Sequence, residues 1–289
     1  MSRQEPRCGP PCRAILVLGM HRSGTSAVAR GVELLGVRLG DRLLPGDAHN
    51  PKGYFEDEEV VELNTALLHA GGTSTFSLRR PQHEAWRGTA AEGMARVARA
   101  LVARREATGG PWGFKDPRTC LTLPFWQGLL RQAGILTGYV LVIRHPLSVV
   151  ASLERRNGLG LRRSLLLWLL HTSSSVRYTR GLPRVLVDYD RLLGDPAAQV
   201  RRIADALEIE VDERVEAALK EYSTTFIDPG LRHHATRRGP WPRSLASAAA
   251  RTLYGALEKR QSGLPGPAAD LAAAMIDHLW AATSEAVRR

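Results

Sequence analysis

The chain has 289 residues, of which 44% are hydrophobic, so it is long enough for one large α/β domain with a substantial core. Lys and Arg number 40 against 29 Asp and Glu, and this net charge of +11 predicts an acidic partner: nucleic acid, anionic lipid, an acidic glycan or a phosphorylated nucleotide. The first residues lack the apolar segment of a secretory signal, and no apolar run approaches the roughly 20 residues that span a bilayer. We therefore expect a cytoplasmic protein without membrane insertion.

Three cysteines, Cys8, Cys12 and Cys120, are too few and too scattered for a disulfide framework. A zinc site would need a second pair of Cys or His ligands besides Cys8 and Cys12, and the sequence has none at the usual spacing. We therefore expect reduced thiols and no metal site. Residues 1–12 contain three prolines and a glycine, and we expect them to form a disordered lead to the folded chain.

The first structural unit is predicted over residues 14–35. An apolar run of strand length at 14–18 precedes Gly-Met-His-Arg-Ser-Gly-Thr-Ser at 19–26, which has the spacing of a phosphate-binding P-loop. A helix with one apolar face follows and ends near Gly36. Glycines let the backbone approach an anion, and the helix N-terminus adds unpaired N–H groups and a partial positive charge. The unit predicts an anion site, the alternative being a glycine turn without a ligand.

One difference from the loop of a nucleoside triphosphatase limits the kind of phosphate ligand that this loop can bind. Where such a loop has Lys before Ser or Thr, this chain has Thr25 before Ser26. A positive charge is supplied instead from within the loop by Arg22, whose planar guanidinium suits a bidentate contact with phosphate or sulfate oxygens. This exchange favours a single 5′-phosphoryl group over a triphosphate held with magnesium.

Residues 40–53 are rich in Gly, Pro, Asp and Asn and predict a loop, after which a helix is expected to end near residues 71–72. Acidic residues at 57–59 complement the dipole of that helix. Glu56 stands at the junction of loop and helix, where a side chain can point into a cleft, and is the better candidate for chemistry.

A short element broken by proline is expected at residues 112–118, which read Trp-Gly-Phe-Lys-Asp-Pro-Arg. A Lys-Asp pair is most often a surface ion pair of little energetic value. Because this pair follows an apolar stub in a chain that already has an anion loop, we expect Lys115 to face the ligand.

Residues 139–143 predict a second strand with Arg144 at its carboxyl end. His145 and Pro146 then open a helix that carries Ser152 on its second turn. Ligands of open parallel sheets bind outside the carboxyl ends of the strands, so Arg144 and the first loop should face one crevice. Two anion sites in one crevice predict a ligand with two separated phosphate groups. In the alternative interpretation, Arg144 caps the strand end and Ser152 packs within its helix.

Alternating strands and helices indicate one α/β layer architecture over the rest of the chain. The remaining expected elements are helices at 84–107, 159–180, 196–207 and 212–221, a strand at 184–187, a basic loop at 227–243, and helices within 244–289 with a break at 263–267. Seven basic residues and one acidic residue occur in 231–260, a charge that suits an acidic glycan or lipid headgroup.

These motifs resemble those of the sulfotransferases that use 3′-phosphoadenosine 5′-phosphosulfate (PAPS). Residues 19–26 look like their 5′-phosphosulfate loop, in the Arg-Ser-Gly-Thr form of bacterial members and tyrosylprotein sulfotransferases. Residues 142–152 resemble their 3′-phosphate site, where Arg144 and Ser152 match the Arg and Ser that bind that phosphate. Residues 115–117 are similar to the Lys-Asp-Pro of tyrosylprotein sulfotransferases, whose lysine assists transfer, and Glu56 falls near the place of their catalytic glutamate.

The resemblance implies a three-layer α/β/α fold with a central parallel sheet, like that of the P-loop nucleoside triphosphate hydrolases. The α/β domain would cover residues 13–243, and 244–289 would be its helical C-terminal extension. PAPS would be the co-substrate, without a metal, and the acceptor a hydroxyl or amine of a small molecule or glycan, an acidic one included; a lipid or peptide acceptor is also permitted. No nucleic-acid partner is expected.

The resemblance also assigns roles to single residues. Glu56 would be the catalytic base, and Lys115 and Arg22 would stabilise the leaving phosphate. The residues expected to bind PAPS are Arg22, Ser23, Gly24, Thr25, Ser26, Arg144 and Ser152. Asp116 and His21 are the next candidates for the base, and Trp112 and Tyr189 are candidates for stacking on adenine. Residues 237–239, Arg-Arg-Gly, are similar to an Arg-Lys-Gly that contacts the 3′-phosphate in cytosolic sulfotransferases.

Two other functions stay open. A P-loop nucleotide kinase would share the fold, but the loop lysine is missing and no acidic strand end stands out for magnesium. A non-enzymatic nucleic-acid-binding protein would explain the charge of +11, but aromatic residues make up only 6% of the chain and no basic-aromatic stacking run is visible. The oligomeric state cannot be read from the sequence.

Overall fold

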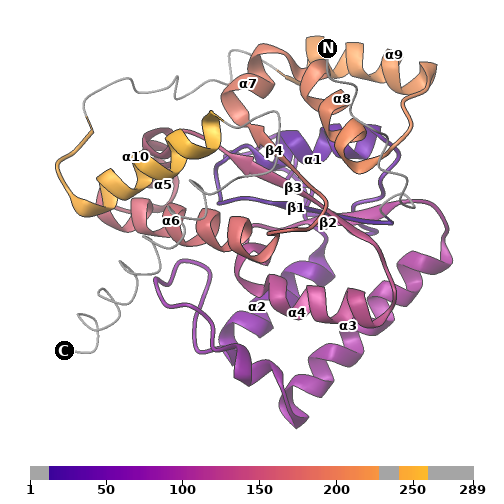
Figure 1. Ribbon diagram of the computed structural model, residues 1–289, viewed down its shortest axis with the longest axis horizontal. Helices are drawn as coiled ribbons and strands as arrows, with labels where there is room; N and C mark the ends of the chain where they lie inside the picture. The colour runs from indigo at the N-terminus through magenta and orange to yellow at the C-terminus, as the bar shows by residue number, and fades with distance from the viewer. Residues whose placement is uncertain (1–12, 228–240, 260–289) are drawn as a thin grey trace.

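The computed structural model describes residues 13–227 and 241–259. A four-stranded parallel sheet has the strand order β2-β1-β3-β4 and is covered by helices on both faces, as Figure 1 shows. The strands are β1 (Ala14–Leu18), β2 (Trp112–Lys115), β3 (Thr137–Ile143) and β4 (Arg184–Asp188). The predicted three-layer α/β/α fold with a central parallel sheet is therefore confirmed.

Ten α-helices and two shorter helical turns complete the described part of the chain. The helices are α1 (Thr25–Leu34), α2 (Glu58–Ala70), α3 (Thr89–Ala107), α4 (Thr119–Gln132), α5 (Pro146–Asn157), α6 (Leu161–Tyr178), α7 (Tyr189–Gly194), α8 (Pro196–Leu207), α9 (Glu213–Glu221) and α10 (Leu245–Glu258). A 3₁₀ turn covers His83–Trp86, and a π-helical turn covers Tyr222–Phe226. No helix in this part of the chain is both long and apolar enough to cross a membrane.

Two hydrophobic cores lie on opposite faces of the sheet. Successive side chains of a strand point to opposite faces, and β1 shows this division: Leu16 and Leu18 join one core, whereas Ile15 and Val17 join the other. The first core is shared with α2 to α6 and α10, and the second with α1, α8 and α9 (Figure 1). Because all four strands are buried on both faces, their near-continuous apolar runs are typical of a parallel sheet.

Several element boundaries differ from the sequence expectation. The helix expected over 84–107 is divided, because Gly88 has a φ of 99° and interrupts it before α3. Helix α4 was not predicted from the sequence, and it contains Pro124, a residue that argues against a helix interior. Gly36 follows the last turn of α1 with a φ of 81°, which agrees with its predicted place at the helix end. The expectations for 1–12, for most of the loop at 227–243 and for 260–289 lie outside the described residues.

Candidate active site

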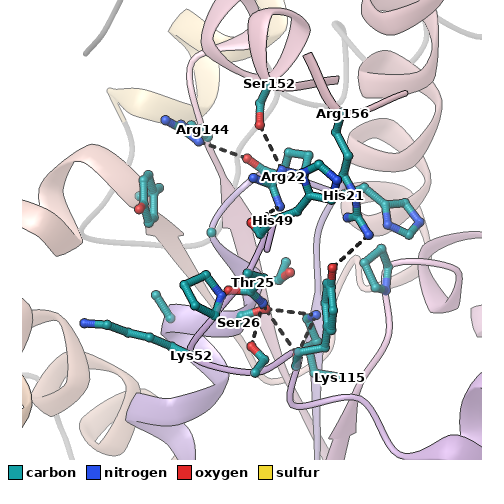
Figure 2. A pocket seen from close by; sticks show the side chains of 18 of the residues that line it. His21, Arg22, Thr25, Ser26, His49, Lys52, Lys115, Arg144, Ser152 and Arg156 are labelled. Carbon is teal, nitrogen blue, oxygen red and sulfur yellow. Dashed lines mark hydrogen bonds between the residues drawn. The ribbon is translucent and has the colours of Figure 1, made fainter. Parts of the chain in front are cut away.

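A cavity of about 330 Å³ opens at the carboxyl ends of the strands. Its walls come from the loop after β1, the segment 48–56, the end of β2, the helix α5 and the start of α7 (Figure 2). The charged residues among its lining are six basic ones and one acid: Arg22, Lys52, Lys115, Arg144, Arg155, Arg156 and Glu56. Such a charge balance in a concave site suits an anionic ligand.

The loop after β1 is shaped for a close approach of its backbone. Arg22 and Gly24 both have left-handed backbones, with φ of 68° and 87°. A Cβ at Gly24 would lie 2.0 Å from the ring of Tyr189, so this position has room only for glycine. Helix α1 begins directly after Gly24, and no side chain of the described residues caps its first turn. The N-terminus of α1 therefore presents its N–H groups at the cavity.

The start of this loop, directly after β1, is held by a residue of α4. The backbone N–H of Gly19 donates to the Sγ of Cys120 at 3.2 Å. Burial raises the pKa of the Cys120 thiol to about 11, so it stays protonated, and Cys120 is free, as the sequence predicted for it. Cys8 and Cys12 lie outside the described residues.

The two segments predicted to bind anions, the loop after β1 and the pair Arg144 and Ser152, are in direct contact. Arg22 donates from Nε to the Oγ of Ser152 at 2.8 Å, and Arg144 donates from Nη1 to the backbone oxygen of Arg22 at 3.2 Å. The guanidinium of Arg144 also lies 4.7 Å from the ring centroid of Tyr189, a cation–π contact. Figure 2 shows Arg144, Ser152 and Arg22 at the same side of the cavity. The structure thus brings together the loop and the residues that follow β3.

The end of β2 reaches the same loop. Lys115 donates from Nζ to Glu56 Oε1 at 2.6 Å, to the backbone oxygen of Tyr54 at 2.9 Å and to the Oγ of Ser26 at 3.3 Å. Asn50 donates from Nδ2 to the same Oγ at 3.2 Å. One lysine therefore connects the proposed base, the segment before it and the start of α1.

Asp116, a second candidate for the base, lies behind the cavity and does not line it. Its carboxylate is fully buried and accepts from Asn64 Nδ2 at 2.9 Å and from Arg118 Nη1 at 2.8 Å. Burial raises the pKa of Asp116. Arg118 also lies 3.7 Å from Glu56 Oε2. Asp116 is thus placed to hold Arg118 beside Glu56 rather than to take a proton from a ligand.

His21, the other candidate, lines the cavity wall. Its ring lies 5.3 Å from Phe76 and 6.3 Å from His171. Burial lowers the pKa of His21 well below its ordinary value, and the charge of Arg118 adds to this effect, so the imidazole is neutral at pH 7. His21 therefore adds no positive charge to the cavity.

Of the two candidates for adenine stacking, the structure places only Tyr189 at the cavity. Trp112 pairs in register with Ala14 at the opposite, amino end of the sheet, where its buried indole donates to Glu106. The stacking hypothesis for Trp112 is therefore wrong. Residues 237–239 lie outside the described residues.

Several further lining residues were not singled out from the sequence, among them Tyr54, Arg156, Lys52 and Phe226. Tyr54 bonds Lys115 through its carbonyl, and Arg156 donates from Nη2 to the Tyr54 hydroxyl at 2.8 Å. Lys52 donates to the backbone oxygen of Phe226 and lies 5.1 Å from its ring centroid. A signal existed for Arg156, and equally for the lining residue Arg155, because they stand four and three residues after Ser152 and so share its face of α5.

Solved sulfotransferase structures share this fold, although no family model and no curated protein sequence matches the chain. Sulfotransferase STF9 from Mycobacterium avium aligns over 89% of this chain and 79% of its own, with a TM-score of 0.50 and 14% identity. The sulfotransferase domain from the curacin biosynthetic pathway aligns over 85% of this chain and 98% of its own, with a TM-score of 0.50 and 13% identity. The sulfotransferase domain of the Synechococcus PCC 7002 olefin synthase covers 88% and 98%, with a TM-score of 0.43 and 18% identity. The first two matches show that the chain has the sulfotransferase fold, in agreement with the motif resemblance.

Proposed function

We propose that the protein is a sulfotransferase that moves a sulfuryl group from PAPS to a hydroxyl or amine of an acceptor. The observation that carries this proposal is one cavity in which the loop after β1 meets both Arg144 with Ser152 and Lys115 with Glu56. The first pair suits a phosphate, and the second supplies an acid–base group beside a cation.

The cavity suits a nucleotide with separate 3′- and 5′-phosphate groups. Backbone N–H groups of residues 23–26, at the start of α1, would hold the 5′-phosphate. Arg144 and Ser152 would hold the 3′-phosphate, and Tyr189, already in contact with Arg144, lies beside them. The volume of about 330 Å³ is within the usual range for small-molecule sites, which favours a small anion over a nucleic acid as the partner of these basic residues.

The transfer step needs no group other than PAPS, the acceptor and these side chains. The bond from sulfur to the oxygen of the 5′-phosphate breaks while the acceptor oxygen or nitrogen forms a new bond to sulfur on the opposite side. Glu56 accepts the proton that the acceptor loses. Lys115 and Arg22 stabilise the negative charge that the leaving 5′-phosphate gains. The products are adenosine 3′,5′-bisphosphate (PAP) and a sulfated acceptor.

A thermal shift experiment tests the proposal. PAP, AMP and ATP with magnesium are compared at one ionic strength and at one common concentration, about 100 times the dissociation constant of PAP, where PAP adds roughly 2.7 kcal/mol of stability. We expect the largest shift with PAP, because AMP lacks the 3′-phosphate and the loop lacks the lysine that spans a triphosphate. A shift with magnesium-ATP and none with PAP would contradict the proposal and favour a nucleotide kinase.

A further inference from the structure

Arg156 lies at the part of the cavity where an acceptor has to approach. Its guanidinium donates to the Tyr54 hydroxyl at 2.8 Å and lies 5.3 Å from the ring centroid of Tyr54. The backbone oxygen of the same Tyr54 binds Lys115, whose other partner is Glu56. Figure 2 shows Arg156 next to His21 and Arg22, reaching down from α5. If Glu56 is the base, the acceptor atom that attacks sulfur stands within this group.

The proposed PAPS contacts leave Arg156 without an anionic partner inside the cavity. The 5′-phosphate is matched by the loop and Arg22, and the 3′-phosphate by Arg144 with Ser152, whereas Lys115 is paired with Glu56. Arg156 has only the neutral phenol of Tyr54 as a hydrogen-bond partner among the described residues. The nearest acid in this chain of contacts is Asp47, which is exposed and accepts a hydrogen bond from the same Tyr54 hydroxyl at 2.7 Å.

A second arginine, Arg155, adds positive charge to the cavity next to Arg156. Arg155 also lines the cavity and is exposed, and no side chain of the described residues pairs with it. Ser152, Arg155 and Arg156 stand at positions i, i+3 and i+4 of α5, so they share one face of the helix. Burial is the main cause that lowers the pKa of Arg22, and the positive charge of Arg156 adds to it, so the two guanidinium groups repel each other. An anion placed between Arg156 and the reaction centre would relieve this repulsion.

We infer that Arg156, assisted by Arg155, forms an anion subsite on the acceptor side of the cavity, and that the acceptor carries a phosphate or similar oxyanion near the hydroxyl or amine that is sulfated. Arginine suits this role because its planar guanidinium binds two oxygens of one oxyanion. The inference rests on the proposed function, because the acceptor side is defined by Glu56 and Lys115.

Inorganic phosphate is the probe that tests the subsite. The protein is first saturated with PAPS, so that the nucleotide and sulfuryl positions are filled, and phosphate is then titrated against chloride at equal ionic strength while the unfolding temperature is recorded. We expect phosphate to add a further stabilisation in the wild type and phosphate affinity to fall about 10- to 100-fold in Arg156→Gln, the loss typical of charged hydrogen bonds. Arg162→Gln removes the same charge from an exposed position on α6 outside the cavity, and should behave as the wild type.

Tyr54→Phe provides a second variant that keeps every charge. It removes the hydroxyl that holds Arg156, so phosphate affinity should fall about two- to tenfold. Acetate in a parallel titration shows whether a carboxylate is also bound.

Three results would overturn the subsite: no phosphate increment over chloride, an unchanged increment in Arg156→Gln, or a loss of PAPS affinity in Arg156→Gln as large as in Arg144→Ala. The last would assign Arg156 to the nucleotide. If PAPS itself gives no shift in the wild type, the proposed function fails, and the inference falls with it; the two failures are therefore distinguishable.

Discussion

The amino group of Lys115 lies 2.6 Å from the carboxylate of Glu56, and only 2% and 7% of the two side chains are exposed. A buried ion pair adds little net stability, but removing one partner typically costs about 3–5 kcal/mol because the other charge is left buried. Each group therefore holds the other in place. Since Lys115 also reaches Ser26, the pair fixes Glu56 relative to the loop that we propose binds the 5′-phosphate.

We expect Glu56→Gln to lower the rate of sulfuryl transfer by about 10² to 10⁴, the usual contribution of a general base, while PAP still binds. The amide keeps the shape of the side chain and a partner for Lys115 but cannot take a proton. Transfer from radiolabelled PAPS and the PAP thermal shift measure the two effects separately.

Glu58→Gln is the matched control for Glu56→Gln, because Glu58 lies in the first turn of α2 and outside the cavity. Its activity should stay within about twofold of the wild type, as is usual for surface substitutions. Normal turnover in Glu56→Gln would place the base elsewhere. His21 would then be the next residue to replace, because Asp116 is bound behind the cavity.

Arg144→Ala should weaken PAP binding about 10- to 100-fold and leave AMP binding nearly unchanged. A hydrogen bond to a charged group is worth about 1.5–3 kcal/mol, and only PAP has the 3′-phosphate that Arg144 is proposed to bind. Calorimetric titration of both nucleotides measures the difference. Equal losses for PAP and AMP would mean that Arg144 supports the loop through its contact with the Arg22 carbonyl instead.

The sequence was most informative where chemistry is local. Strand β1, the glycine loop and α1 follow each other directly, so the apolar run, the glycine spacing and the helix periodicity predicted this unit, which the structure confirms, and the anion site that we propose there. The positions of Arg144 at a strand end and of Ser152 on the next helix were predicted in the same way. The parallel order of the sheet then required both motifs to meet at one edge.

Contacts that depend on tertiary packing could not be predicted from the sequence. Nothing local shows that Tyr54 binds Lys115 through its carbonyl and Arg156 through its hydroxyl, because the three residues come from separate elements. The prediction that Trp112 stacks on adenine was wrong for a related reason. It lies three residues before Lys115, and in a strand this distance is roughly 10 Å, which moves Trp112 to the far end of the sheet.

Gly24→Ala should destabilise the protein more than Gly36→Ala, although both glycines have a similar positive φ, 87° and 81°. Left-handed backbone costs a non-glycine residue on the order of 1 kcal/mol, and Gly36 has nothing within 4 Å of an added Cβ. At Gly24 the Cβ would meet the ring of Tyr189 at 2.0 Å, so the loop or the ring has to move.

Chemical denaturation of the two variants measures this difference, and we expect Gly24→Ala to lose at least about 1 kcal/mol more than Gly36→Ala. The PAP thermal shift should be reduced in Gly24→Ala only, because Tyr189 also contacts Arg144. Equal stability and equal PAP binding in the two variants would show that Tyr189 can leave the loop without cost.

The stability of the protein should fall as the pH drops from about 6.5 to about 4, and His171 should be one of the causes. Burial lowers the pKa of His171 from 6.5 to about 4. Between these values the unfolded chain binds a proton at this residue and the folded protein does not, so acid favours unfolding by up to about 1.4 kcal/mol per pH unit. His21, whose pKa is also lowered, acts in the same direction. Asp116, whose pKa is raised, acts in the opposite direction above its ordinary value.

His171→Asn isolates the contribution of this residue, because the amide can still donate to the Leu167 carbonyl, 2.9 Å from His171 Nδ1, but does not titrate. Denaturation curves over this pH range should show a shallower loss of stability in His171→Asn than in the wild type, whatever its stability at pH 7. His69→Asn, at an exposed position on α2, should keep the slope of the wild type. The same slope in His171→Asn and the wild type would mean that His171 takes up its proton in the folded protein, which requires that water reaches the buried ring.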